Sequence, residues 1–337
     1  MYDGYFVFDS VVHMYDNRTD NVIDPTAMRY MTKRFSMSGA LEVDTNEGRA
    51  TDVGRALDAM FVDAKLDLAM AQTVPLFSYW RDGFAPAALQ YELAQADDRV
   101  LFCGGVDPVY QGLRGAIDEL NRQHDEWGAT SFKFYQGHRG GISWRSDDRR
   151  VAYPLFERML ELGLDVAQFH KGIPLGHERL EDLRPNDLQQ AALDFPDMKF
   201  VIHHFGSPFI DETLNIASRF ENVYVVMSAI INAFPVAPWT VYEAIGKALA
   251  QVGEDRLMWG SEAFAYPTIR PYLEAFLAME MPEDLQERYG YPEVSEQAKR
   301  KVAGLNMAGI MKIDPADVMR RGGATEAQIS VALGLTP

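Results

Sequence analysis

Residues Lys199-Phe-Val-Ile-His-His204 form a short apolar run that ends in two histidines. The same arrangement occurs in Val166-Ala-Gln-Phe-His170 and in Phe8-Asp-Ser-Val-Val-His13, and a fourth run, Arg256-Leu-Met-Trp-Gly-Ser-Glu262, ends in a carboxylate. A buried parallel strand that finishes in a polar, ligand-type side chain is how barrel folds present chemical groups at their strand ends. The repeated pattern therefore predicts a barrel whose functional site lies at these ends.

Eight short apolar runs recur along the chain, with helical patterns between them. Runs that are apolar throughout, without alternation, are typical of parallel strands covered on both faces. They are Tyr5–Val12, Leu66–Thr73, Val100–Val106, Ser131–Tyr135, Asp165–His170, Lys199–His204, Val223–Met227 and Arg256–Gly260. An open doubly wound sheet shares these local signals, but no glycine-rich nucleotide loop follows the first strand. We therefore expect an α/β fold, a (β/α)8 TIM barrel.

The length of 337 residues suits one such barrel with insertions, so we expect a single domain over residues 1–337. Residues 17–52 are long, polar and mixed, and they separate the first strand from a predicted helix at 53–65. We interpret this stretch as a lid insertion over the strand ends. Residues 282–337 are predicted to form a helical C-terminal extension.

The chain carries 49 acidic and 32 basic residues, a net charge of −17. This charge would repel nucleic acid and an anionic membrane surface, so neither is expected as a partner. A carboxylated substrate would need a local cluster of Arg, Lys or a metal ion to attract it. The N-terminus has no signal-peptide pattern, and no run reaches the roughly 18 apolar residues of a membrane span, so we expect a cytoplasmic protein.

The polar residues at the strand ends have the side chains that transition metals prefer, because metal sites combine imidazoles with a carboxylate. His13, His170, His204 and Glu262 follow strands one, five, six and eight, whose ends converge on one mouth in a closed barrel. His203 and His204 are neighbours, and side chains alternate along a strand. We expect His204 to face the barrel and His203 to pack outward against a helix.

Five further residues are candidates for binding the substrate. Lys133 is a charge flanked by apolar residues on a predicted core strand, and it needs a partner or a lowered pKa. It could anchor a carboxylate, form a carboxylated metal bridge, or simply make an ion pair at the strand end. His138 lies in a glycine-rich loop after the fourth strand. Arg81, Arg139 and Lys171 could build an anion pocket or be solvated surface charges.

Three motifs carry a resemblance to a known family. They are His204-Phe-Gly206, Trp259-Gly-Ser-Glu-Ala-Phe-Ala-Tyr-Pro267 and a closing helix from Lys301 to Ala308. With them, the chain resembles the amidohydrolase superfamily, in the branch of aminocarboxymuconate-semialdehyde decarboxylase, resorcylate-type decarboxylases and lignin-pathway C–C hydrolases. The resemblance covers nearly the whole chain and also implies the TIM-barrel fold.

The resemblance implies one divalent metal ion, zinc or manganese. In the family a first-strand His-x-His pair, a fifth-strand His and an eighth-strand acid hold this ion, which implies His13, His170 and Glu262 as ligands here. His204 would be the general acid/base, with Glu262 sharing the catalytic role. The chain departs from the pattern at Val11, which replaces the first histidine of the pair, and at Glu262, which replaces the usual Asp.

These features predict an enzyme, a metal-dependent hydrolase that uses metal-activated water to cleave a C–C, C–N or C–O bond of a small, aromatic-derived, carboxylated substrate. Glu262 or His204 would take the proton from that water. A first alternative is a non-oxidative decarboxylase of an aromatic or dienoic acid. A second alternative, favoured by Val11, is a catalytically inert, metal-free barrel that binds a ligand or assembles with a partner. Related enzymes are often dimers, so a homodimer is compatible with the resemblance.

Overall fold

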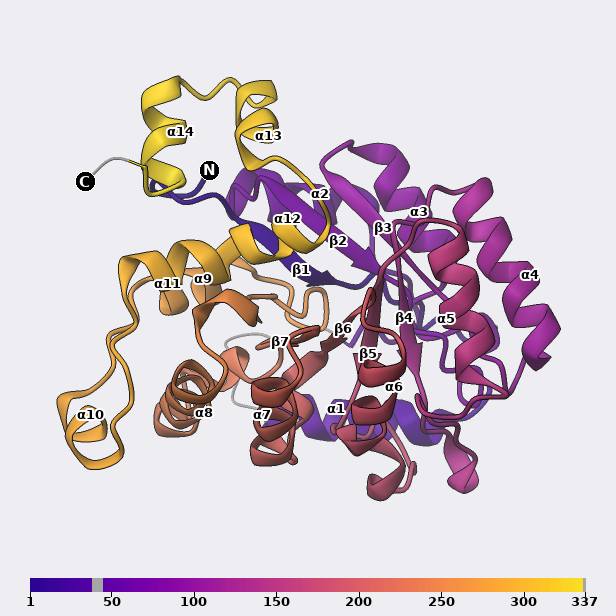
Figure 1. Cartoon of the computed structure of the whole chain (residues 1–337). Helices are drawn as coiled ribbons and strands as arrows, with labels where there is room; N and C mark the ends of the chain where they lie inside the picture. Colours follow the sequence, from indigo (N-terminus) through magenta and orange to yellow (C-terminus); the bar gives the residue numbers. More distant parts are fainter. Residues whose placement is uncertain (38–44, 336–337) are drawn as a thin grey trace.

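The protein, described by a computed structural model for residues 1–37 and 45–335, forms a barrel of eight parallel strands that pair in sequence order (Figure 1). Val12, at the end of the first strand, bridges in parallel to Ala263 beyond the last strand, so the sheet closes on itself. The strands are β1 (Phe8–Val12), β2 (Leu68–Gln72), β3 (Val100–Gly105), β4 (Ser131–Tyr135), β5 (Val166–His170), β6 (Lys199–Ile202), β7 (Val223–Val226) and β8 (Leu257–Met258). The predicted (β/α)8 TIM barrel is confirmed.

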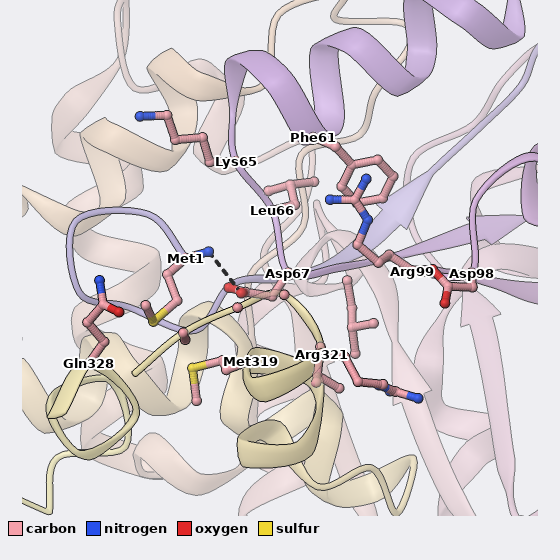
Figure 2. Close-up of a pocket in the computed structure, with 15 residues that line it drawn as sticks. Met1, Phe61, Lys65, Leu66, Asp67, Asp98, Arg99, Met319, Arg321 and Gln328 are labelled. Carbon is pink, nitrogen blue, oxygen red and sulfur yellow. Dashed lines mark hydrogen bonds and ion pairs between the residues drawn. The ribbon is translucent and has the colours of Figure 1, made fainter. Parts of the chain in front are cut away.

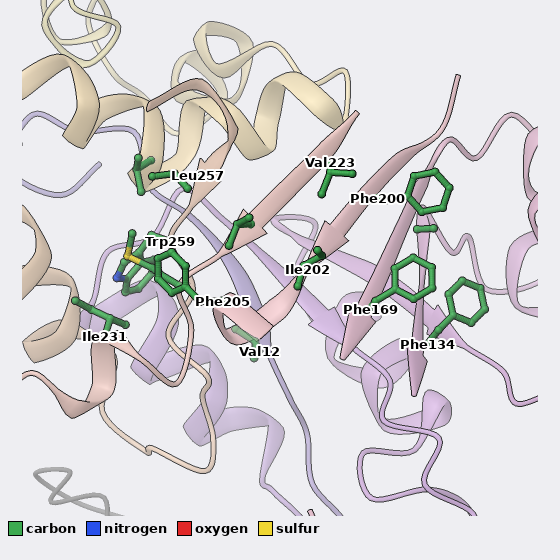
Figure 3. Packing of buried hydrophobic residues seen from close by; sticks show 14 of the residues in the cluster. Val12, Phe134, Phe169, Phe200, Ile202, Phe205, Val223, Ile231, Leu257 and Trp259 are labelled. Atoms are coloured by element: carbon green, nitrogen blue, oxygen red, sulfur yellow. The ribbon is translucent and has the colours of Figure 1, made fainter. Parts of the chain in front are cut away.

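Helices connect consecutive strands and cover the outside of the barrel. They are α3 (Ala87–Ala96), α4 (Gly112–Asp125), α5 (Ala152–Glu161), α6 (Leu188–Asp194), α7 (Ile210–Arg219) and α8 (Pro238–Gln251). The side chains of Phe134, Phe169 and Phe200 point outward from β4, β5 and β6 and pack in a row (Figure 3), with ring centroids 5.4 Å and 5.9 Å apart. The helices bury this apolar outer face of the sheet, which explains why the strands are apolar on both sides.

The inside of the barrel is apolar at the end where the strands begin. Phe8, Met70 and Val226 belong to one buried cluster there, together with Met307 and Val318 from the C-terminal helices. Those helices are α12 (Asn306–Ile310), α13 (Pro315–Arg321) and α14 (Glu326–Ala332), and α13 and α14 lie beside the N-terminus in Figure 1. They are preceded by α9 (Arg270–Leu277), α10 (Glu283–Tyr289) and α11 (Glu296–Arg300). Packed apolar side chains therefore fill this end of the barrel.

The opposite end, where the strands finish, lies next to the segment between β1 and β2. This segment contains α1 (Pro25–Met37) and leads into α2 (Val53–Leu57). α1 lies at the end of the barrel opposite to α13 and α14 (Figure 1). Its residues Ala27 and Met31 pack in one apolar cluster with Tyr79, Trp80 and Tyr266 from the strand-end loops. Residues 38–44 of the predicted lid lie outside the described residues.

Candidate active site

Four side chains meet at the carboxyl ends of the strands. His13 follows β1, His170 ends β5, His204 follows β6 and Glu262 follows β8. The side-chain carboxylate of Glu262 lies 3.8 Å from His13 Nε2 and 3.6 Å from His204 Nδ1, and His204 Nε2 lies 3.1 Å from His170 Nδ1. We call these four residues the strand-end cluster. The structure brings together all four residues that the apolar runs pointed to.

His13 has the hydrogen-bonding pattern of a metal-ligating imidazole. Its Nδ1 lies 2.8 Å from the carbonyl oxygen of Gln72, and since a carbonyl only accepts, Nδ1 carries the proton. Nε2 then holds a lone pair, and it is buried without a hydrogen-bond partner in the described part of the chain. Burial, followed by the charge of Lys133, lowers the pKa of His13 to about 3, so the ring is neutral at physiological pH. Metal-binding histidines are oriented by such a backbone contact.

Both histidines after β6 face the barrel. β6 ends at Ile202, and the backbone then turns through left-handed conformations at His204 and Phe205, with φ of 59° and 52°. Strand alternation no longer applies in this turn. His203 reaches inward, where its Nε2 donates to Gln168 Oε1 at 2.9 Å. The prediction that His203 packs outward against a helix is therefore wrong.

Glu262 lies between His13 and His204 at the centre of the strand-end cluster. Burial raises the pKa of Glu262 to about 7, whereas the Lys133 charge and a hydrogen bond from the Ser228 hydroxyl oppose this shift. For His204, burial lowers the pKa well below its ordinary value, so the ring is neutral. A carboxyl group that exchanges its proton near neutral pH beside a neutral imidazole is suited to general acid/base chemistry.

A polar layer lies directly below the strand-end cluster, inside the barrel. Lys133 is fully buried, and its Nζ donates to Gln72 Oε1 at 3.3 Å. Gln72 Nε2 donates to Gln168 Oε1 at 2.8 Å. Burial lowers the pKa of Lys133 to about 7, and the Glu262 carboxylate opposes this shift. The structure shows no ion pair of Lys133 within 4.0 Å of any described carboxylate, so the ion pair considered for this strand is not formed among those residues.

Three of the other substrate-binding candidates lie on loops. His138 is buried, and its Nε2 lies 2.7 Å from Asp107 Oδ2. Arg139 is exposed and forms an ion pair with Asp24 at 2.7 Å, which links the loop after β4 to the segment before α1. Arg81 is exposed, and its backbone N–H donates a hydrogen bond to the carbonyl oxygen of Asn21 at 2.8 Å. Binding of substrate by these residues stays a prediction.

Lys171, the residue after β5, is buried rather than solvated. Its Nζ lies 2.7 Å and 2.9 Å from the two carboxylate oxygens of Asp187, and both side chains are almost fully buried. Asp187 also accepts a hydrogen bond from the backbone N–H of Ser146 at 2.8 Å. The interpretation of Lys171 as a surface charge is wrong. The ion pair with Asp187 indicates a structural role for Lys171, and its role in binding substrate stays a prediction.

Sequence reasoning missed three residues that contact the strand-end cluster. Tyr135 stacks on His170 with ring centroids 4.5 Å apart, and Ser228 Oγ lies 3.1 Å from His204 Nδ1. The backbone carbonyl oxygen of Gln72 accepts a hydrogen bond from His13 Nδ1. Each of the three stands at or just after the end of an apolar run, as the histidines do. That position was the available signal, but serine, glutamine and tyrosine are less characteristic of metal sites.

A narrow crevice, too tight to hold a water molecule in this structure, lies beside His170 and Tyr135. It is also lined by Leu76, Ile173 and Glu178, which belong to the loops after β2 and β5. A separate hollow lies near the C-terminal helices (Figure 2), where Asp67 is paired with the ammonium of Met1 at 2.9 Å. Active sites of TIM barrels lie where the strands end. The crevice, which includes His170, therefore lies at the end of the barrel where an active site is expected.

Val11 stands where the family pattern has a metal-binding histidine. Its side chain is fully buried in the apolar cluster that also contains Phe8 and Met70. It packs directly against Gly260, since a Cβ atom added at Gly260 would lie 2.7 Å from Val11 Cγ2. Hydrocarbon side chains fill this part of the barrel. Valine cannot bind a metal ion, so position 11 does not supply the first ligand of the family pattern.

Asp9 provides a prediction on the pH dependence of stability. The carboxyl is fully buried and accepts hydrogen bonds from the backbone N–H groups of Val11 and Ser261, and burial raises its pKa from 3.8 to about 6. Between these pH values the folded chain binds more protons than the unfolded chain, so the contribution of Asp9 falls as the pH rises. The loss is complete above the folded-state pKa and amounts to roughly 3 kcal/mol.

Asp9→Asn, which imitates the protonated carboxyl, should remove this dependence. We expect the free energy of unfolding of the variant, measured by urea titration, to gain on the wild type between about pH 4 and about pH 7. A constant difference across this range would show that Asp9 has an ordinary pKa.

The sequence matches the family model described as "Amidohydrolase" over residues 53–308, which is most of the chain. The chain belongs to the amidohydrolase family. This is an enzyme family of hydrolases and lyases, and the resemblance inferred from the motifs is thereby confirmed. A search among proteins of curated function found no significant match. No helix within residues 1–37 and 45–335 has the length and apolarity needed to cross a membrane.

Solved structures share the fold of this amidohydrolase at low sequence identity. An uncharacterized TIM-barrel protein from Bordetella bronchiseptica has a TM-score of 0.66 and 16% identity, covering 91% of this chain and 98% of that chain. A 2,6-dihydroxybenzoate decarboxylase from Rhizobium has a TM-score of 0.58 and 13% identity, covering 91% and 99%. A dihydroxybenzoic acid decarboxylase from Polaromonas with bound manganese and an inhibitor has a TM-score of 0.61 and 13% identity, covering 91% and 97%.

The donor atoms of the strand-end cluster fit a divalent cation in kind. His13 Nε2 is a buried lone pair that faces a carboxylate oxygen across 3.8 Å, a gap that a cation with bonds of roughly 2.0–2.2 Å can bridge. In the structure as described for residues 1–37 and 45–335, no three His, Cys, Asp or Glu side chains are yet arranged to hold a metal ion. The third expected donor, His170 Nδ1, faces His204.

Proposed function

We propose that this amidohydrolase is a metal-dependent, non-oxidative decarboxylase of a small aromatic carboxylic acid. The observation that carries the proposal is the depth of the strand-end cluster, whose side chains are between 1% and 13% exposed. Hydrolysis needs water as a reactant, whereas decarboxylation does not. A carboxylate also loses its charge when it leaves as CO2, and a site shielded from water favours that loss. The burial therefore favours decarboxylation over the hydrolysis that the sequence put first.

The surroundings of the cluster support an aromatic acid as the substrate. Tyr135 stacks on His170, and the ring of Tyr15 lies 5.4 Å from that of His13, so flat rings border the site. Lys133 is buried beneath them, and in its protonated form it would supply the positive charge that a carboxylate needs because the whole chain has a net charge of −17. Two of the fold neighbours are decarboxylases of dihydroxybenzoic acids.

His13 Nε2, Glu262 and His170 Nδ1 would hold the divalent cation, zinc or manganese. When bound, the ion would supply Lewis-acid polarisation of substrate oxygens and charge neutralisation. Manganese in the Polaromonas decarboxylase supports the choice of a divalent ion. The segment 17–52 would act as a lid, with α1 over the strand-end loops, and the ion pair between Arg139 and Asp24 would help to hold it in place.

Glu262 and His204 would supply the proton that the reaction consumes. The bond between the ring carbon and the carboxyl carbon breaks, CO2 leaves, and the electron pair stays on the ring carbon. Glu262 would deliver a proton to that carbon. The Glu262 carboxylate would regain its proton from solvent for the next cycle, and His204, whose Nδ1 is 3.6 Å from that carboxylate, would take the proton up and pass it on.

The test is an assay of the purified protein, stripped of metal and then reloaded with Mn²⁺ or Zn²⁺. The probes are 2,6-dihydroxybenzoate, 5-carboxyvanillate and the lactone 2-pyrone-4,6-dicarboxylate, with CO2 and ring products measured together. We expect CO2 from a hydroxybenzoate in the reloaded protein and a loss of about 10³-fold or more after chelation.

His13→Ala serves as the control for the metal site, and it should lower Zn²⁺ affinity measured by calorimetry. Opening of the lactone without release of CO2 would overturn the decarboxylase assignment in favour of a hydrolase. Failure of both metals to bind the wild-type protein would overturn metal dependence and favour the inert barrel.

A further inference from the structure

Ser228 lies against the proposed acid/base residue from the side opposite to His170. Ser228 is fully buried, and both its hydroxyl and its carbonyl oxygen approach His204 Nδ1, at 3.1 Å and 3.2 Å. The loop that carries it is fixed by Asn232, which accepts from Ala229 N and donates to the carbonyl of Ser261. His204 is therefore held between two polar groups of Ser228 and the ring of His170.

The position of the proton on His170 is settled by its neighbours. His170 Nε2 lies 2.6 Å from the carbonyl oxygen of Ile173, which can only accept, so Nε2 carries the proton. His170 Nδ1 then presents a lone pair to His204 Nε2 at 3.1 Å. A buried imidazole is neutral and has a single N–H, so His204 can donate a hydrogen bond from only one of its two ring nitrogens.

Two hydrogen-bond arrangements fit the same heavy atoms. In the first, the Ser228 hydroxyl donates to His204 Nδ1, and His204 Nε2–H donates to His170 Nδ1. The lone pair of His170 Nδ1 is then used by this hydrogen bond and is not available to a metal ion. In the second, His204 Nδ1–H donates to the Ser228 carbonyl, and the hydroxyl turns to the Glu262 carboxylate, its other acceptor. Two lone pairs, those of His204 Nε2 and His170 Nδ1, then face each other, and a cation between or beside them would stabilise this arrangement.

We propose that Ser228 is a positioning residue whose hydroxyl selects the tautomer of His204 and thereby decides whether His170 Nδ1 is available to a divalent cation. This inference rests on the proposed metal-dependent function. Metal uptake would convert the first arrangement into the second without moving the backbone.

Ser228→Ala removes the hydroxyl and keeps the carbonyl, so only the second arrangement keeps a partner for His204 Nδ1. In the metal-free variant we expect nitrogen NMR of His204 to show the proton on Nδ1, whereas the metal-free wild type should show it on Nε2. In the first arrangement the variant leaves the lone pair of His204 Nδ1 against the Ser228 carbonyl oxygen, so this arrangement competes less with the metal. Zn²⁺ affinity measured by calorimetry should then rise about fivefold, which corresponds to one hydrogen bond. Adding Zn²⁺ to the wild type should shift its proton to Nδ1.

Two variants control the experiment. Ser228→Thr keeps the hydroxyl and should restore the wild-type tautomer and affinity. Ser10→Ala removes another fully buried hydroxyl, one that has no hydrogen-bond partner among the residues described, and should change neither. Thermal unfolding of all variants checks that they fold.

The outcomes separate this inference from the proposed function. If the wild type and Ser228→Ala show the same tautomer, or if Ser228→Ala changes Zn²⁺ affinity no more than Ser10→Ala, the role of Ser228 is overturned while metal dependence stands. If none of the proteins binds Zn²⁺ or Mn²⁺, the proposed metal dependence fails, and the coupling of Ser228 to the metal fails with it.

Discussion

Glu262→Gln should reduce turnover of the decarboxylation substrate by about 10³-fold, within the range that general acid/base groups contribute. The substitution keeps the size of the side chain but removes both the proton and the charge of the carboxyl group. It also removes a proposed metal ligand, so Zn²⁺ affinity should fall at least about tenfold. Initial rates of CO2 release and calorimetric titration with Zn²⁺ measure the two effects separately.

The fold should survive the exchange at Glu262, because burial disfavours its charged form and glutamine carries none. Asp9→Asn is the matched control, since it converts a second buried carboxyl, one that accepts hydrogen bonds from the backbone N–H groups of Val11 and Ser261. We expect its turnover to stay within a few-fold of the wild type. Wild-type turnover in Glu262→Gln would remove Glu262 from the chemistry, whatever the substrate is.

Lys171→Met should lower the free energy of unfolding by about 3–5 kcal/mol, the usual cost of breaking a buried ion pair from one side. The Asp187 carboxylate would lose its contacts at 2.7 Å and 2.9 Å and remain buried without a positive partner. Urea unfolding followed by circular dichroism measures the loss.

The double variant Lys171→Met with Asp187→Asn should recover most of this loss. The asparagine oxygen can still accept from the backbone N–H of Ser146, while no charge is left buried. The pair of variants also distinguishes a structural from a substrate-binding lysine. Unchanged stability together with a raised KM in Lys171→Met would assign Lys171 to the substrate instead.

The positions of the strand ends could be predicted from the sequence because burial on both faces leaves a continuous apolar run, and a polar residue at its end stands out. His13, His170 and Glu262 were found in this way, and a closed barrel has only one place to bring them together. The fold was predictable for the same reason, since eight such runs alternate with helical segments.

The orientation of side chains beyond a strand could not be predicted. The alternation rule failed at His203 because the chain leaves β6 through two left-handed residues, which the sequence His203-His204-Phe205 does not reveal. The pairing of Lys171 with Asp187 depends on how a loop of the chain folds back, and the contact between Ser228 and His204 depends on which strands are neighbours at the mouth. Such contacts are set by tertiary packing.

The packing of Val11 on Gly260 limits how single substitutions can change this site. A histidine at position 11 would have to find room where Val11 already fills the space above Gly260, beside apolar residues such as Phe8 and Met70. A single Val11→His exchange would therefore meet a steric penalty before the new ligand could act. A ligand at position 11 would need compensating changes in its neighbours, so single substitutions can tune this site only through the donors already present.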